Sequence, residues 1–219
     1  MVVCLFLDTV DAQHFTAETR CVVQEICDRA EIEVRALLPS LPEHIEVAAQ
    51  TGKCVIQQTG DMGTAVSPER VVWIVDGSRK GKVVGVAPRH LCPTLFHEFH
   101  HLARGWVKSN YNHTPSIIDA AISEGLATAF ERDFGGREAP WASYPTDAAR
   151  WLEELLALPP NANYSDWMFH HPDGRSWIGY RAGTFVTDHA MAASGRSSAE
   201  LVATSSTELL HMAGFTVPA

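Results

Sequence analysis

Residues 94–104 read Thr-Leu-Phe-His-Glu-Phe-His-His-Leu-Ala-Arg, and they are the most informative stretch of the sequence. His97 and His101 lie four residues apart, a spacing that places both side chains on one face of a helix. Both imidazoles can therefore point toward one metal ion, while Glu98 can reach a water molecule beside the ion without becoming a ligand. Thr94 falls on the same polar face. The apolar residues of the stretch point into packing instead: Leu95, Phe99 and Leu102.

A third ligand is expected further along the chain, because a catalytic zinc ion takes three protein ligands and keeps one position open. The next strong carboxylate on a helix after His101 is Glu124, which is surrounded by apolar residues. Burying a carboxylate is costly unless it is paired or bound to a metal. Gly125 allows this helix to approach the first one closely. The sequence therefore predicts that His97, His101 and Glu124 hold one Zn²⁺ ion and that Glu98 is the catalytic base.

The same residues have a plainer interpretation, an ordinary amphipathic helix pair in which Glu124 forms an ion pair with an arginine such as Arg104. Asp119 is a candidate partner for a ligating imidazole, since such rings usually donate their other N–H to a carboxylate or carbonyl. A solvated surface charge explains Asp119 equally well. His100 is turned away from the ligand face, where it can pack or contact Arg104.

The pattern along the rest of the chain predicts an α+β fold: a small N-terminal β-sheet with one long helix, then a mostly helical C-terminal half. We expect a single domain, residues 1–219, with a β-rich lobe to about residue 86 and a helical lobe from about residue 87. Strands are expected over residues 2–7, 45–49, 54–58 and 71–75. Helices are expected over 16–38 and 91–104, from Thr114-Pro115 to Asp133, and over 147–157, 179–193 and 197–212.

Composition and charge narrow the classes of partner and location. A net charge of −9 makes nucleic acid and anionic membranes poor partners, because the chain would repel phosphate. The five cysteines are odd in number and form no Cys-x-x-Cys pair, which favours reduced thiols. The N-terminal apolar run ends at Asp8 without a basic segment before it, which is not typical of a signal peptide. These features predict a cytoplasmic location.

Residues 94–104 and 122–127 also resemble a family of zinc-dependent peptidases catalogued as a domain of unknown function, within the gluzincin-like metallopeptidases. The resemblance spans roughly residues 55–215. It implies a zincin-like fold with an active-site cleft between the two lobes. It also implies His97, His101 and Glu124 as zinc ligands and Glu98 as catalytic base, while Gly125 stands where thermolysin-like enzymes have Asn. Softer matches follow at Pro140-Trp141, Trp167, Gly179-Tyr180, Gly183 and residues 200–215.

These observations lead us to expect a metalloendopeptidase-type hydrolase that acts on a peptide or protein. Tyr180 is the candidate donor to the tetrahedral oxyanion, with His170, His171 and Arg175 as alternatives. The other interpretation of Tyr180 is an aromatic residue of the core or of its rim. Peptide substrates commonly add as a strand to a sheet edge, and residues 60–66 or 71–75 are candidates for that edge.

Two other functions stay open. One is a non-hydrolytic, chaperone-like or binding protein that retains a zinc site. The other is a zinc hydrolase that acts on a non-peptide amide or ester. The presence of Glu98 favours hydrolysis, since a structural metal site does not need a base. The sequence leaves the substrate, the cleavage preference, the regulation and the oligomeric state open.

Overall fold

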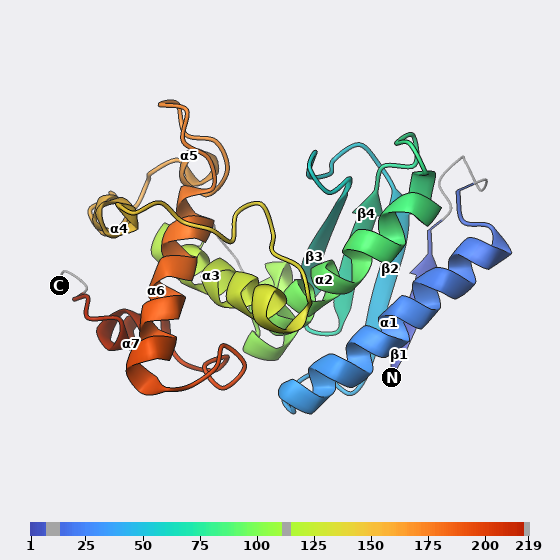
Figure 1. Ribbon diagram of the computed structural model, residues 1–219, viewed down its shortest axis with the longest axis horizontal. Helices are drawn as coiled ribbons and strands as arrows, with labels where there is room; N and C mark the ends of the chain where they lie inside the picture. The colour runs from blue at the N-terminus through green and yellow to red at the C-terminus, as the bar shows by residue number, and fades with distance from the viewer. Residues whose placement is uncertain (8–13, 111–114, 217–219) are drawn as a thin grey trace. The chain divides into compact units, whose positions relative to one another are not determined.

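The computed structural model describes residues 1–7, 14–110 and 115–216 (Figure 1). The chain divides into two compact units, Met1–Asn110 and Tyr111–Ala219. The first contains a four-stranded sheet and two long helices, and the second is helical. This confirms the predicted α+β fold class; the cleft between two lobes stays a prediction. In the described part of the chain, no helix combines the length and the apolar character that a membrane crossing requires.

The sheet of the first unit is mostly parallel and has the strand order β1-β2-β4-β3. Its parallel pairs are β1 with β2 and β2 with β4, whereas β3 runs antiparallel to β4. Strand β3 is therefore an edge strand and β4 is not, which excludes the predicted alternative of residues 71–75 as the exposed edge. The strands are β1 (Val2–Phe6), β2 (Ile45–Thr51), β3 (Asp61–Ser67) and β4 (Arg70–Val75).

Two helices, α1 (Ala17–Leu37) and α2 (Lys82–Arg104), lie side by side across one face of this sheet (Figure 1). Thr16 begins α1 as predicted, since its side chain accepts a hydrogen bond from the N–H of Thr19. Gly105 ends α2 in a left-handed conformation, with φ of 73°, that a glycine adopts without strain.

Helix α2 begins nine residues earlier than the predicted Leu91, at Lys82. Pro88 and Pro93 lie inside it, and each lacks the N–H that a helix interior normally uses, which argues against a helix when the sequence is considered alone. Burial explains why the helix persists, because three residues of its first turns are 4% exposed or less: Val83, Val86 and Ala87.

The predicted strand over residues 54–58 is wrong. These residues belong to a turn region, in which the N–H of Gly60 donates to the carbonyl of Ile56 and the N–H of Ile56 donates to the carbonyl of Asp61. The strand instead follows the turn, as β3. Because Gly63 lies in its interior, β3 has a low strand propensity of its own. Pairing with β4 stabilises it as a strand. A short 3-10 helix, η1 (Lys108–Asn110), closes the unit.

The second unit is built from five helices in its described residues. Those expected over 147–157 and 179–193 are confirmed, whereas the one expected over 197–212 begins only at Ser206, after a capping box of Ser205 and Glu208. Ser116 caps the first helix, and Thr114 lies outside the described residues. The helices are α3 (Ile117–Phe134), α4 (Ala148–Leu156), α5 (Tyr164–Met168), α6 (Ile178–Ser194) and α7 (Ser206–Met212).

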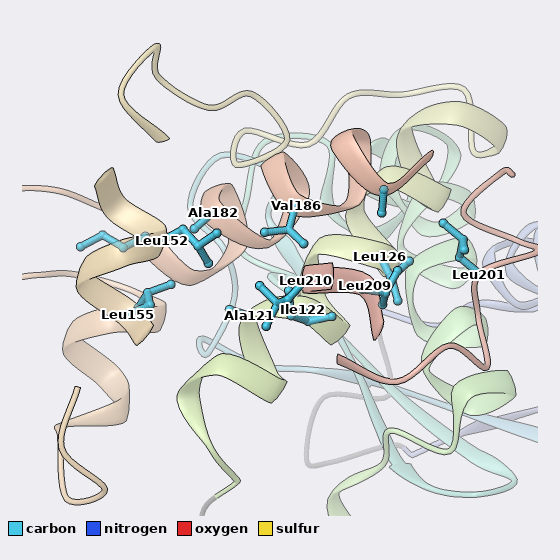
Figure 2. Close-up of a cluster of buried hydrophobic side chains, with 12 residues drawn as sticks. Ala121, Ile122, Leu126, Leu152, Leu155, Ala182, Val186, Leu201, Leu209 and Leu210 are labelled. Carbon is cyan, nitrogen blue, oxygen red and sulfur yellow. The ribbon is translucent and has the colours of Figure 1, made fainter. Parts of the chain in front are cut away.

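The core of the second unit lies where α3, α4, α6 and α7 converge (Figure 2). Helices α3 and α6 form the most extensive contact, and α4 and α7 pack against α6. Burial of this apolar cluster fixes the position of α3, the helix that carries Glu124. Its members include Ala121, Ile122, Leu126, Leu152, Leu155, Ala182, Val186, Leu201, Leu209 and Leu210.

Candidate metal centre

The two predicted histidine ligands lie together in the last turns of α2. The Nε2 atoms of His97 and His101 are 3.1 Å apart, and the two residues are only 7% and 4% exposed. Two nitrogens bound to one tetrahedral zinc ion, each at about 2.0–2.1 Å, lie roughly 3.3 Å apart. The pair therefore has the separation that a shared ion requires. The buried apolar side of α2 holds this geometry through Leu95, Phe99 and Leu102, as predicted.

Glu98 lies against the edge strand of the sheet. Its side chain is 7% exposed, and its Oε2 accepts a hydrogen bond of 2.7 Å from the backbone N–H of Ala65 on β3. Because Ala65 uses its N–H in this way, the N–H does not point toward β4. Alternation along the strand then directs the backbone groups of Gly63 away from β4 as well. The proposed base thus lies along the outer edge of β3.

Asp61 supports this arrangement, although the sequence predicted no role for it. It is 1% exposed, and its Oδ2 accepts hydrogen bonds of 2.9 Å from Thr94 Oγ1 and from Trp73 Nε1. Thr94 lies one helical turn before Glu98, so this carboxylate ties α2 to the first residue of β3. No local pattern indicates this role, since the three residues meet only when the helix packs on the sheet.

Glu124 lies on α3 in the second unit and is half-buried. The expectation that Gly125 lets this helix approach the helix of His97 and His101 is wrong, because Gly125 faces α6: a Cβ added at Gly125 would lie 2.0 Å from the backbone carbon of Gly183. Tyr164 lies close enough that burial, and then the charge of Glu124, raise the pKa of its hydroxyl above the usual value. Nothing in the sequence predicted a role for Tyr164.

Among the described residues, one group of histidine, cysteine, aspartate and glutamate side chains can hold a metal ion. It consists of His97 and His101 from the first unit and Glu124 from the second, each offering one ligand atom. The donor set of two imidazoles and one carboxylate is that of many catalytic zinc sites. That the three residues bind an ion stays a prediction.

Comparison with families of known proteins gives a match over most of the chain. The model of a family described as "Predicted Zn-dependent protease (DUF2268)" matches residues 17–211. The chain belongs to this family. No curated protein matches it. Membership in a family of predicted zinc-dependent proteases confirms the resemblance drawn from residues 94–104 and 122–127. The family description names zinc as the metal and proteolysis as the reaction for which the His-His-Glu group can be tested.

Tyr180, the predicted donor to the oxyanion, lies on α6 in an aromatic cluster. Its ring centroid is 5.3 Å from that of Trp177 and 5.8 Å from that of Trp141. The side chain is half-buried. Its role as a donor stays a prediction.

The three alternative donors occupy the segment between α5 and α6. The Nδ1 of His170 is 3.2 Å from the hydroxyl of Ser176. His171 and Arg175 both contact Asp173, and Arg175 also forms an ion pair of 2.7 Å with Glu154. Hydrogen bonds from the Arg175 N–H and from the two side chains lower the pKa of Asp173 to about 2. Arg175 is therefore already engaged by two carboxylates, which makes it the least available of the three.

Proposed function

We propose that this protein is a gluzincin-type zinc metallopeptidase in which His97, His101 and Glu124 hold the ion and Glu98 is the general base. The observation that carries the proposal is the pair of buried Nε2 atoms, 3.1 Å apart, on the helix turn that also presents Glu98. Glu124 comes from the second compact unit, so the shared ion is part of the proposal.

The donor set fits zinc in its catalytic rather than its structural form. Three protein ligands leave a fourth position open, whereas structural zinc sites are closed by four. Zinc bound in this way acidifies water and polarises a carbonyl group. None of the cysteines belongs to the group, which also favours a catalytic site over a zinc-finger type of site.

Glu98 has the geometry of a base that is already oriented. The charge-assisted hydrogen bond from the Ala65 N–H holds the carboxylate in one orientation on β3. In the proposed reaction this carboxylate takes a proton from water and then passes it to the leaving amine. Holding the carboxylate on a strand rather than free in solvent reduces the reorganisation that the reaction requires.

The edge of β3 supports a peptide rather than a small ester as substrate. A peptide can add to it as an extra strand through the outward N–H of Gly63 and through its carbonyl, which also accepts a hydrogen bond of 2.7 Å from the Thr64 hydroxyl. The Ala65 N–H is engaged by Glu98, and the Asp61 carbonyl accepts from the N–H of Ile56. The pairing we propose is therefore short and centred on Gly63, close to the base.

The experiment that tests the function is a digest of a fluorescent peptide library by the full chain. We expect cleavage that a chelator abolishes and added zinc restores. Glu98→Gln should retain zinc by elemental analysis and lose cleavage by at least about a hundredfold, the contribution typical of a general base. Glu25→Gln, on the exposed side of α1, is the matched control and should behave like the wild type.

The same digest separates the alternatives. Zinc-loaded wild type that cleaves no peptide but hydrolyses ester or simple amide substrates would point to a non-peptide hydrolase. Zinc-loaded wild type that hydrolyses none of these substrates would point to a binding protein. Cleavage that persists in Glu98→Gln would show that another group is the base.

A further inference from the structure

Gly63 lies directly against the side chain of Glu98. A Cβ added at Gly63 would lie 2.6 Å from Glu98 Cγ and 2.8 Å from Glu98 Oε1, and it would lie 2.6 Å from Thr94 Cγ2. Carbon atoms that are not bonded to each other do not approach this closely without a shift. The space that the Cβ of any other residue would occupy at position 63 is therefore filled in part by the side chain of Glu98, the proposed base.

Backbone conformation does not explain the glycine. Gly63 is not among the described residues with positive φ, and it pairs with Trp73 in regular antiparallel register. A glycine in a strand interior weakens the strand, since it has no side chain to pack and loses more conformational entropy on folding. Its presence in β3 is thus a cost to the sheet, and close approach of another group is the physical reason that remains.

A side chain at position 63 would displace Glu98 rather than the sheet. The crowded atoms belong to two side chains, and the strand itself is fixed by its pairing with β4, where Trp73 is fully buried. Thr94 is held in place, because its hydroxyl donates to Asp61. Glu98 has the longer and more flexible side chain of the two, so we expect Glu98 to be the group that moves.

We propose that Gly63 is a positioning residue for the Glu98 carboxylate. Its missing side chain lets the carboxylate lie on β3, where the Ala65 N–H, two residues along the same strand, holds Oε2 at 2.7 Å. Together, Gly63 and the Ala65 N–H form the Glu98 seat. The inference rests on the proposed function for its catalytic meaning, but the seat is a property of the first unit alone and can be measured without catalysis.

The test compares Gly63→Ala with Gly85→Ala. Gly85 is the matched control because it lies on α2, and a Cβ there would come no closer than 3.6 Å to the nearest atom, the Lys80 carbonyl oxygen. We expect Gly63→Ala to keep its zinc content and a near wild-type KM, and to lose kcat by about 10- to 100-fold, the loss typical of misplacing a catalytic group by about 1 Å. Gly85→Ala should match the wild type.

A second readout does not depend on activity. The amide resonance of Ala65, observed by ¹H–¹⁵N NMR, should lie downfield in the wild type because of its short bond to a carboxylate. It should move upfield in Gly63→Ala, in the same direction as in Glu98→Ala, and stay in place in Gly85→Ala.

Crowding at Thr94 is separated from crowding at Glu98 by a double variant. Thr94→Ser removes Cγ2 but keeps the hydroxyl that donates to Asp61. If Gly63→Ala melts early, Gly63→Ala with Thr94→Ser should recover the melting temperature of Thr94→Ser alone, yet still show the lowered kcat and the shifted Ala65 resonance.

The outcomes distinguish the inference from the function. Wild-type kcat together with an unmoved Ala65 resonance in Gly63→Ala would overturn the positioning role, even if Glu98→Gln is inactive. If the wild type cleaves nothing, the proposed function fails, and the Ala65 resonance still decides whether Gly63 creates the Glu98 seat.

Discussion

At the scale of single residues, two buried carboxylates organise the first unit. Asp61 and Glu98 are 1% and 7% exposed, and each is satisfied by donors that come from another element. Burying a carboxylate costs free energy unless hydrogen bonds replace those it made with water. Asp61 accepts hydrogen bonds from Thr94 and Trp73, and Glu98 accepts one from the Ala65 N–H on β3.

Asp61→Ala is expected to destabilise the protein, because it leaves the indole N–H of the fully buried Trp73 without its acceptor. The expected loss is about 1–3 kcal/mol, the cost of an unsatisfied buried group. Urea unfolding measures it. Asp61→Asn retains an acceptor oxygen and should lose less; equal losses for the two variants would show that the hydrogen bonds are not the reason.

Tyr180 is the predicted donor to the oxyanion, and we propose Tyr164, which lies close to Glu124, as an alternative to it. The phenylalanine variants of the two residues distinguish them. Removing a single oxyanion donor lowers kcat by about 10²–10³-fold. We expect one of the two variants, each differing from the wild type by one hydroxyl, to show this loss with KM little changed. Steady-state kinetics on one peptide measures both, and near wild-type kcat in both would exclude these two hydroxyls.

Asp76 gives a pH dependence with a defined sign. Hydrogen bonds from Ser78 and Lys53 lower its pKa from 3.8 to about 2. The unfolded state binds the proton more tightly, so the stabilisation is complete above about pH 4 and is lost as the pH falls toward 2. The unfolding free energy of the wild type minus that of Asp76→Asn should thus be positive at pH 7 and shrink toward zero near pH 2. A difference that does not change over this range would contradict the assignment.

At the scale of elements, the sequence predicts what is local and misses what is set by packing. The amphipathic pattern and the caps are local, and so α1 and the end of α2 at Gly105 are predicted closely. Strand β3 and the first nine residues of α2 are not, because β3 depends on pairing with β4 and α2 overrides two prolines by burial.

Some residues of the candidate site can be predicted from local sequence, and others are brought together only by packing. The His-Glu-x-x-His spacing is a local property and points to His97, Glu98 and His101 directly. Asp61 and Gly63 contact α2 from a strand more than 30 residues earlier in the chain, so no spacing rule finds them. Glu124 is suggested from its chemistry alone, as a carboxylate among apolar residues.

The crossing of α3 and α6 also gives a prediction, because it depends on two glycines. A Cβ added at Gly183 would lie 1.8 Å from the carbonyl oxygen of Ala121, so the clash is with backbone and the helices must separate. Gly183→Ala is expected to cost about 1–3 kcal/mol through overpacking. Thermal melting measures it, with Gly85→Ala as control; a melting temperature equal to that of the control would contradict the close crossing.

At the scale of the whole molecule, the proposed ligand set takes two residues from the first compact unit and one from the second. A ligand that binds only the folded protein stabilises it, by about 2.7 kcal/mol when its free concentration is a hundred times the dissociation constant. Zinc should therefore raise the melting temperature of the wild type, and a chelator should lower it. A melting temperature that does not respond to either would argue against a metal centre.

The central claim is that Glu124 shares one zinc ion with His97 and His101, and the zinc dissociation constant tests it most directly. Competition with a chromogenic chelator gives this constant for the wild type, for Glu124→Ala and for the control Glu138→Ala, which changes an exposed glutamate. We predict that Glu124→Ala weakens binding by more than about 10- to 100-fold, the loss seen when only a supporting residue of a metal site is removed. Glu138→Ala should bind as the wild type does. Equal affinity in the wild type and Glu124→Ala would contradict the account.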